Sequence, residues 1–452
     1  MNPAGPRWIP ADPALPGLAE FFGPAGARSV AAEMVREAAD SSVDADSGEL
    51  RYVKYKPTKH CIVQWAFPAS SGDPFMVSAK LFSGIQGAAV ISQPKFRSLA
   101  ESIRSRANGR TEPYRYLHHR QILFQLFPLD AKLPGLPFAT SGVWAAAAFA
   151  RALDVRSTTI RITEITPVAY NPWNRCVFRY TVEESSSRRQ YFAKLFRDDR
   201  GQTMAATLTA VSELLGASGG SWRIPAPLAF IPEARMLVLE ALEKAVGARS
   251  LLKQAVEDPV ARRRARDVFA RTAETLLEFQ QAVIQGLPAI TPQALLRYYQ
   301  RKIDRVSQIA PELTDTIGTQ LARLETEASE LPTEPMVLSH GAFRHTHLLL
   351  CGDKLGLVDL DNLRLSGVSA DPGDFLAYLD RTALRRPALR PIIEELEAAF
   401  VAGLRRRRSF DMRWVAWHRS AAHVKWALRS FHSLSLKGRL CAEDLAALGL
   451  GI

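Results

Sequence analysis

The first hundred residues carry alternating apolar and polar positions of the kind found in β-strands. Residues 51–55 (RYVKY), 61–65 (CIVQW) and 75–82 (FMVSAKLF) are rich in β-branched and aromatic side chains, and the turn residues Pro57 and Gly72 lie between them. Such runs predict neighbouring strands of a small antiparallel sheet. Apolar residues at helical spacing predict a short helix near residues 31–39 and another at 95–107.

The same pattern appears a second time further along the chain. Residues 55–61 (YKPTKHC) are echoed by 170–176 (YNPWNRC), and the AKLF of residues 79–82 returns at 193–196. The offset is 115 residues in the first pair of segments and 114 in the second. A polar hairpin precedes the last strand of each copy. We therefore predict that one β-unit is duplicated, and because only two copies occur, the chain is not a solenoid.

Beyond the second copy the pattern becomes helical. Strands are expected at 228–231 and 236–240, and only one later β-rich island, residues 336–363, interrupts the helices. Strands followed by helices indicate an α+β fold with segregated layers. The helical segments, with apolar residues at helical spacing, are 257–285, 292–309, 311–330, 386–405 and 411–430.

Composition narrows the class of protein. The chain has 452 residues, 47% of them hydrophobic, and four cysteines without a CxxC pair, which fits a reduced, cytoplasmic, globular protein. No apolar window is long enough for a membrane span or a signal peptide. The net charge of +12 comes partly from the arginine runs 262–266 and 405–408, which we interpret as solvated helix faces. No nucleic-acid module accompanies them, so we do not expect nucleic acid as a partner.

The β-rich island holds the most specific motif. Residues 336–350 read MVLSHGAFRHTHLLL, residues 355–361 read LGLVDLD, and residues 370–375 read ADPGDF. This order resembles the aminoglycoside-phosphotransferase-like family of the protein-kinase-like superfamily. That family has a His-Gly-Asp catalytic loop with an Asn five residues after the Asp, then an Ile-Asp-Phe metal-binding strand and a Gly-Asp-Pro-type turn. The resemblance covers about residues 160–430.

The resemblance implies a protein-kinase-like two-lobed fold with a duplicated N-terminal β-lobe. Its domains would be residues 1–152 (the repeat of the β-lobe), 153–243 (the ATP-binding lobe) and 244–452 (the helical lobe). It also implies ATP and Mg²⁺ as cofactors. Lys194 would contact the nucleotide phosphates, Glu213 would be its ion-pair partner, Glu240 and Leu242 would lie at the adenine-binding hinge, and Asp359 would hold the metal.

The sequence departs from the family pattern at two positions of the catalytic loop. Ala342 stands where the family has the catalytic Asp, and His347 where it has the metal-binding Asn. Alanine cannot accept the substrate proton. His347 remains a candidate metal ligand, although imidazole suits magnesium poorly. Asp361, two residues after Asp359, is the candidate for a displaced base or a second metal carboxylate. His340 completes the candidate catalytic pair and is usually a structural, hydrogen-bonding residue in this family.

Several of these residues also have an ordinary structural explanation. Lys80, the counterpart of Lys194, is expected to be a remnant of the duplication, because no hinge and catalytic loop follow it at the right distance. Asp374 is expected to cap a helix and brace the catalytic loop. His345 and His347 form a His-x-His pair, but a zinc site is not favoured without further ligands nearby.

The sequence is therefore compatible with two functions. The first is an ATP- and magnesium-dependent phosphotransferase acting on a hydroxyl of a small molecule or of a peptide Ser/Thr. The alternative is a pseudokinase that binds nucleotide or a partner protein and acts as a regulatory or scaffold subunit. Retention of Asp359 favours the first, and the changes at Ala342 and His347 favour the second.

Overall fold

A computed structural model describes residues 7–38, 43–70, 72–106, 111–154, 160–184, 187–217, 219–407 and 409–451. The chain divides into two compact units. The first unit comprises Met1–Ala205, Pro227–Ala241 and His432–Leu436, and the second comprises Ala206–Ala226, Leu242–Phe431 and Lys437–Ile452. Helix α7 (Arg200–Ala217) begins in the first unit and ends in the second.

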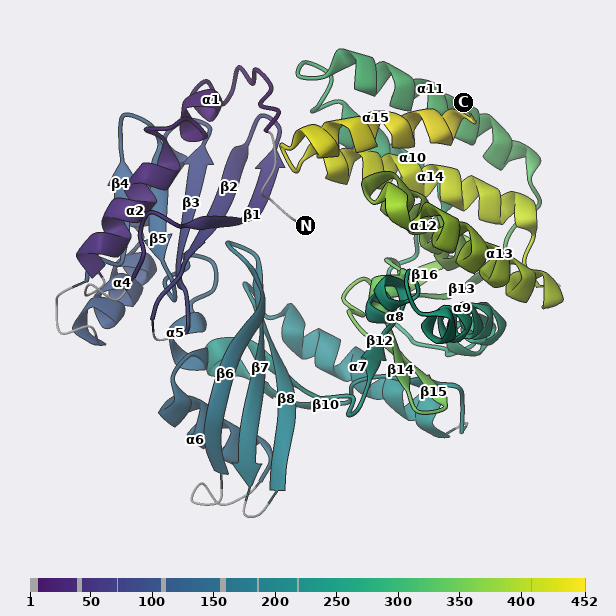
Figure 1. The fold of residues 1–452 in the computed structure, drawn as a ribbon, viewed down its shortest axis with the longest axis horizontal. Helices are drawn as coiled ribbons and strands as arrows, with labels where there is room; N and C mark the ends of the chain where they lie inside the picture. The colour runs from purple at the N-terminus through teal and green to yellow at the C-terminus, as the bar shows by residue number, and fades with distance from the viewer. Residues whose placement is uncertain are drawn as a thin grey trace. The chain divides into compact units, whose positions relative to one another are not determined.

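The first unit contains two five-stranded sheets among its described residues, and both have the same topology (Figure 1). In each sheet the first three strands are antiparallel neighbours, and the fifth strand in sequence lies between the third and the fourth. The predicted duplication of a β-unit is therefore confirmed. The first sheet consists of β1 (Glu49–Lys56), β2 (His60–Phe67), β3 (Phe75–Phe82), β4 (Tyr114–Leu117) and β5 (Ile122–Leu126). The second consists of β6 (Ile160–Asn171), β7 (Arg175–Glu184), β8 (Ser187–Phe196), β10 (Pro227–Ile231) and β11 (Met236–Glu240).

A buried aspartate ties the loop before each sheet to its first turn. Asp12 Oδ2 accepts hydrogen bonds from Tyr55 Oη (2.7 Å) and from the backbone N–H of Thr58 (2.9 Å). In the second copy Asp130 Oδ2 accepts from Tyr170 Oη (2.9 Å) and from the backbone N–H of Trp173 (2.8 Å). Both aspartates begin the same pattern, Asp-x-x-Leu-Pro-Gly-Leu. The duplicated unit is thus longer than the strand pattern alone indicated.

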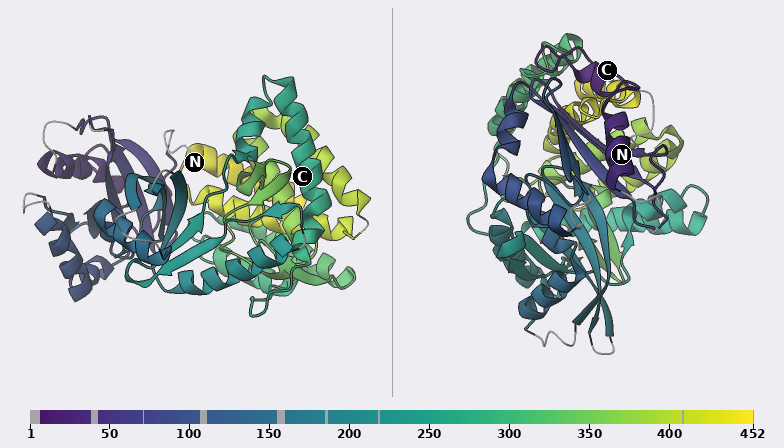
Figure 2. Two further views of the ribbon diagram at one scale, coloured as in Figure 1. Left: turned by 90° about the horizontal axis from the view of Figure 1, so that it is seen from below. Right: turned by 90° about the vertical axis from the view of Figure 1, so that its left-hand side faces the viewer.

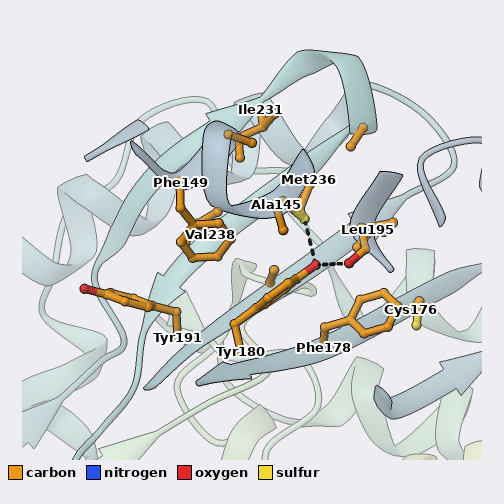
Figure 3. Close-up of a cluster of buried hydrophobic side chains, with 14 of the residues drawn as sticks. Ala145, Phe149, Cys176, Phe178, Tyr180, Tyr191, Leu195, Ile231, Met236 and Val238 are labelled. Carbon is orange, nitrogen blue, oxygen red and sulfur yellow. Dashed lines mark hydrogen bonds between the residues drawn. The ribbon is translucent and has the colours of Figure 1, made fainter. Parts of the chain in front are cut away.

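Helix α6 (Gly142–Ala152) packs against the second sheet and completes its core (Figure 3). Phe149 of this helix lies against Tyr180 and Tyr191, with ring centroids 4.9 and 5.6 Å apart. The buried Tyr180 hydroxyl donates a hydrogen bond to the Ala139 carbonyl at 2.6 Å. Helix α6 thus packs in the core of the second sheet, and the predicted boundary at residue 152 stays a prediction.

Further helices of the first unit lie beside the sheets. Phe96 and Ala100 of α4 share a core with Ile62 and Phe82 of the first sheet, and α2 contacts β2 and β3 of the same sheet. The predicted helix at 31–39 corresponds to α2, although residue 39 lies outside the described part of the chain. These helices are α1 (Leu18–Phe21), α2 (Ala27–Ala38), α3 (Gln86–Ile91), α4 (Pro94–Arg106) and α5 (Leu136–Ala139).

The second unit is a helical bundle with two small sheets. Helix α14 contacts α10, α11 and α12, while α9 packs along α13 (Figures 1 and 2). The helices are α8 (Ala248–Gln254), α9 (Pro259–Gln280), α10 (Pro292–Ile303), α11 (Pro311–Glu330), α12 (Ala370–Arg385), α13 (Arg390–Arg406), α14 (Met412–Phe431) and α15 (Leu436–Leu450). The strands are β9 (Trp222–Arg223), β12 (Val246–Gly247), β13 (Met336–Ser339), β14 (Leu348–Cys351), β15 (Lys354–Leu357) and β16 (Arg364–Gly367).

Several expectations from composition can be compared with this structure. The arginines at 263, 264 and 266 are exposed on α9 and those at 405–407 are exposed at the end of α13, as expected for solvated faces, while Arg408 lies outside the described residues. All four cysteines are buried and free. Within the described residues, no helix is long and apolar enough to cross a membrane.

Candidate active site

Asp371, in the first turn of α12, holds the loop that follows β13. The Asp371 carboxylate is fully buried and accepts hydrogen bonds from Ser339 Oγ (2.9 Å), His340 N (2.8 Å) and Gly341 N (3.2 Å). Three donors converging on one buried carboxylate fix the backbone at the loop's first residues. The sequence predicted this role for Asp374, and that prediction is wrong because the contacts belong to Asp371.

Asp374 has a different environment. It is the fifth residue of α12, and the N-cap position belongs to Ser369, so Asp374 does not cap the helix. Its carboxylate instead pairs with the Lys425 ammonium of α14, at 2.5 Å. Burial lowers the pKa of Lys425 to about 8, which the neighbouring Asp374 carboxylate partly opposes. This pair therefore ties α12 to α14.

Gly341 is required by the close approach of two loops. Its φ of +71° is unfavourable for other residues, and a Cβ there would lie 2.3 Å from the Asn362 carbonyl oxygen. The loop that begins at His340 is thereby packed directly against the segment that follows β15. The structure thus brings two motif segments of the β-rich island into contact.

His340 positions the residue before Asp359. Its ring is fully buried, and Nε2 lies 3.1 Å from the Val358 carbonyl oxygen. Burial lowers the pKa of His340, so the neutral imidazole donates this hydrogen bond through Nε2–H. The ring also stacks on His347, with centroids 5.2 Å apart. His340 was a catalytic candidate from the sequence, and this geometry gives it a positioning role.

Asp359 follows β15 in a left-handed backbone conformation, with φ at +63°. Its Oδ2 lies 3.3 Å from His347 Nε2 and 3.9 Å from an Arg344 guanidinium nitrogen. Arg344 Nε in turn donates to His347 Nε2 at 2.7 Å. Arg344, for which the sequence predicted no role, therefore faces Asp359, the candidate metal ligand. The only signal for it in the sequence is an arginine between Ala342 and the two histidines of the loop.

This arrangement tests the two predicted metal ligands separately. His347 Nε2 already accepts the Arg344 N–H, so its lone pair is not available to an ion, and His347 does not fit as a ligand in this geometry. The Asp359 side chain is 21% exposed and fits. Within the described residues, no group of three or more His, Cys, Asp or Glu side chains is arranged to hold a metal. Magnesium is commonly held by one or two carboxylates together with substrate phosphates, so a single aspartate is compatible with it.

Asp361 and Ala342 are both partly exposed and lie on the two segments that meet at Gly341. Asp359 and Asp361 are two residues apart, a spacing that puts side chains on one face only within a strand. Strand β15 ends at Leu357, before either aspartate, so the alternation of a strand does not apply to them. His345 of the loop after β13 is buried and stacks on Phe269, and burial lowers the pKa of His345 to about 3.

The predicted nucleotide-binding residues are distributed over the two units. Lys194 lies on β8 in the first unit, buried, between Val177 of β7 and Leu237 of β11. Glu240 is the last residue of β11, and the chain passes into the second unit between Ala241 and Leu242. Glu213 is exposed on α7, in the part of this helix that belongs to the second unit. Their roles, including the Lys194–Glu213 ion pair, stay predictions.

Comparison with known families supplies the identification. The model of the phosphotransferase enzyme family matches residues 177–418, from β7 into α14, which is more than half of the chain. The chain belongs to this family. Together with the two equivalent sheets, the match confirms the α+β, protein-kinase-like fold with a duplicated N-terminal β-lobe. A comparison with curated protein sequences gives no match.

Solved structures with similar folds include several small-molecule kinases. A choline/ethanolamine kinase family protein from Mesorhizobium loti is 16% identical, with a TM-score of 0.44, over 68% of this chain and 92% of that one. A glucosamine kinase is 14% identical, with a TM-score of 0.44, over 95% of this chain and 98% of its own. Amicoumacin kinase in complex with AMP-PNP, Ca²⁺ and Ami is 13% identical, with a TM-score of 0.44, over 63% of this chain and 87% of its own.

Proposed function

We propose that this phosphotransferase-family protein transfers the terminal phosphoryl group of ATP to a hydroxyl of a small molecule. The conformation of Asp359 carries the proposal. Aspartate enters the left-handed region at a smaller cost than most non-glycine residues, but glycine would avoid that cost altogether. An aspartate kept at such a position, and held there through the His340–Val358 hydrogen bond, supports a use for its carboxylate.

The other roles follow the family resemblance. Asp359 would hold a divalent ion, for which we propose Mg²⁺; when bound, such an ion neutralises the charge of the nucleotide phosphates. Lys194 would contact those phosphates, and Glu240 and Leu242 would lie beside the adenine. Asp361 is the carboxylate proposed to accept the hydroxyl proton that Ala342 cannot. Because phosphoryl transfer depends chiefly on positioning and charge stabilisation, loss of the usual base lowers the rate without abolishing it.

The finer features of the proposal come from the sequence. The acceptor is a small molecule, with a peptide Ser or Thr as the alternative. Residues 1–152, 153–243 and 244–452 are proposed as the repeated β-lobe, the ATP-binding lobe and the helical lobe. The free cysteines support a cytoplasmic location.

A second candidate function is a pseudokinase that binds nucleotide and regulates a partner protein. The contacts of Asp359 favour it: Arg344 and His347 already surround the carboxylate, and Ala342 supplies no base. In this case the Arg344 guanidinium, not a metal ion, neutralises charge at Asp359. Nucleotide binding would then be independent of divalent ions.

One experiment separates the two candidates. The full chain is incubated with γ-labelled ATP, MgCl₂ and a panel of sugars, aminocyclitols and choline, and its thermal stability is measured with ATP in the presence and absence of EDTA. The proposal expects label in an acceptor, a loss of at least tenfold in Asp359→Asn, and ATP stabilisation that EDTA removes. The matched control, Asp353→Asn in the exposed turn before β15, should behave as wild type. Stabilisation by ATP that survives EDTA, without labelled product, would establish the pseudokinase instead.

A further inference from the structure

The first unit contains a pocket that is lined by both copies of the β-unit and whose lysines come from the repeated β-lobe. Its volume is about 420 Å³, which is within the range of small-molecule sites. It lies on one face of the first sheet, and a turn of the second sheet forms part of its wall. The residues that matter for its chemistry are Lys54, Lys56, His60, Lys80, Lys132 and Trp173.

Strand register explains why the basic residues meet. Lys54 of β1 is directly opposite Ile62 of β2, and Ile62 is opposite Lys80 of β3. In the neighbouring row Lys56 is opposite His60. Because side chains two residues apart point to the same side of a strand, all of these residues project from one face of the sheet. Three lysines are thus placed on one surface by the pairing of β1, β2 and β3.

Trp173 closes the pocket from the second copy of the β-unit. It lies in the turn between β6 and β7, is only 6% exposed, and packs in the core of the first sheet. The Lys80 ammonium lies 4.0 Å from the Trp173 ring centroid and 4.5 Å from that of Phe82. Lys80 is therefore held against two aromatic faces at the base of the pocket. Neither β-unit alone could form this site.

Positive side chains gather in the pocket. Burial lowers the pKa of Lys80 to about 8; Lys132, Lys56 and Lys54 add to the effect, and the Asp130 carboxylate opposes it. His60 has a pKa lowered to about 3, by burial and by the neighbouring lysines, and is neutral. Asp198 also lines the pocket, but its carboxylate pairs with Arg200 at 2.6 Å and with Arg197 at 3.2 Å. Gathering cations in this way opposes folding, and such strain is typical of binding sites.

Comparison of the two copies argues against a remnant of duplication. At the offset of 115 residues, Lys54 and Lys56 correspond to Ala169 and Asn171 of the second copy. A remnant would explain the shared lysine, Lys80, but not two further lysines on the same face that the second copy lacks. The first copy has thus a basic surface of its own.

From this geometry we infer that the repeated β-lobe binds a phosphate-bearing small molecule with at least two negative charges. Lys54, Lys56 and Lys132 contact the phosphate oxygens at the mouth, and Lys80 contacts them from the base of the pocket. Ammonium groups and phosphate oxygens form strong, charge-assisted hydrogen bonds, and the bound anion removes the repulsion among the lysines. This site is independent of the proposed transfer of phosphate and of Lys194.

The test measures binding to the full chain by calorimetry in 0.15 M salt. The probes are inorganic pyrophosphate, glucose 6-phosphate and ATP with EDTA, and a single-stranded RNA is included as a fourth. The pocket variant is Lys54→Gln with Lys56→Gln. The matched control, Lys59→Gln with Lys95→Gln, removes two exposed lysines of the same unit that do not line the pocket. Lys194→Met is measured in parallel.

The inference expects saturable binding of at least one of the three small phosphates. Removing the two pocket lysines should weaken that binding at least tenfold, because each forms a charge-assisted hydrogen bond with the anion. The control pair and Lys194→Met should retain it. Preference among the three probes identifies a bare polyphosphate, a sugar phosphate or a nucleotide. The inference is overturned by absence of binding, by equal weakening in the control, by loss only in Lys194→Met, or by binding of RNA alone.

Discussion

Replacing Asp371 with asparagine tests whether its carboxylate holds the loop that follows β13. The two side chains have nearly the same shape, so Asp371→Asn creates no cavity. In the structure the carboxylate accepts from Ser339 Oγ and Gly341 N at Oδ1, and from His340 N at Oδ2. An asparagine that keeps its carbonyl oxygen at Oδ1 turns its NH₂ group toward the His340 N–H. One buried backbone donor then loses its acceptor.

The magnitude follows from these contacts. An unsatisfied buried N–H costs about 1–3 kcal/mol, and the two remaining hydrogen bonds each weaken by roughly 1 kcal/mol when their acceptor loses its charge. The opposite amide orientation leaves two donors without an acceptor and costs more. We therefore expect Asp371→Asn to lower the free energy of unfolding of the second unit by about 3–5 kcal/mol.

The assay is urea-induced unfolding followed by circular dichroism, with stability obtained by linear extrapolation. Asp353→Asn is the matched control, because Asp353 is exposed in the turn between β14 and β15. A loss below about 1 kcal/mol in Asp371→Asn, or one no larger than in the control, would refute the conclusion that this carboxylate holds the loop.

Three further predictions concern the loop, the duplicated β-unit and the basic pocket. Gly341→Ala should destabilise the protein by at least about 2 kcal/mol in the same assay, because its Cβ would meet the Asn362 carbonyl oxygen; a neutral effect would contradict the close approach. Tyr170→Phe removes a donor from buried Asp130 and should cost about 1–3 kcal/mol, whereas an unchanged urea midpoint would show that the backbone donors suffice. The lowered pKa of Lys80, about 8 against 10.5 in the unfolded chain, means that the unfolded chain binds more protons between these values. The free energy of unfolding of the wild type, relative to that of Lys80→Met, should therefore rise by up to about 3 kcal/mol from pH 8 to pH 10.5. Parallel pH profiles of the two proteins would exclude a lowered pKa for Lys80.

The sequence predicted the regular elements well where local signals coincide. Helix α4 begins at Pro94, one residue before its predicted start at 95, because a proline suits the first helical position. Helix α11 likewise begins with a proline at its first position and has a regular apolar stripe. The start of α12 was placed incorrectly, since the signal used there was an aspartate that turned out to pair with Lys425 of α14. A contact between distant helices cannot be recognised from a local pattern.

The duplication was detected through strands, and its loop was missed. Asp12 and Asp130 are separated by 118 residues, not 115, because the two copies differ in length between this loop and the first strand. An irregular loop has no hydrophobic period to compare, so only its identical Leu-Pro-Gly-Leu letters could have revealed it. The structure makes the equivalence plain because Tyr55 and Tyr170 reach the two aspartates in the same way.

The sequence pointed to His340 and Asp359 but gave no role to Asp371 or Arg344. The motif order placed His340, Asp359 and residues 370–375 in one segment, and the structure brings their loops together. The direction of the Arg344 side chain depends on packing against Tyr378 of α12, with its guanidinium 5.2 Å from the ring centroid. No local pattern specifies that packing. The approach of the Arg344 guanidinium to Asp359 is therefore a result of tertiary structure.

The two β-units share the features that folding requires and differ in those that it does not. Asp12 and Asp130 each accept a hydrogen bond from a backbone N–H of the first turn, so losing either would remove that acceptor. Lys54 and Lys56 add positive charge beside Lys80, and this charge lowers the pKa of the Lys80 ammonium. Residues that lower the stability of the free protein are expected where binding of a ligand restores the lost stability. The basic surface of the first copy is for this reason better explained by an anion that binds there than by descent from a common β-unit.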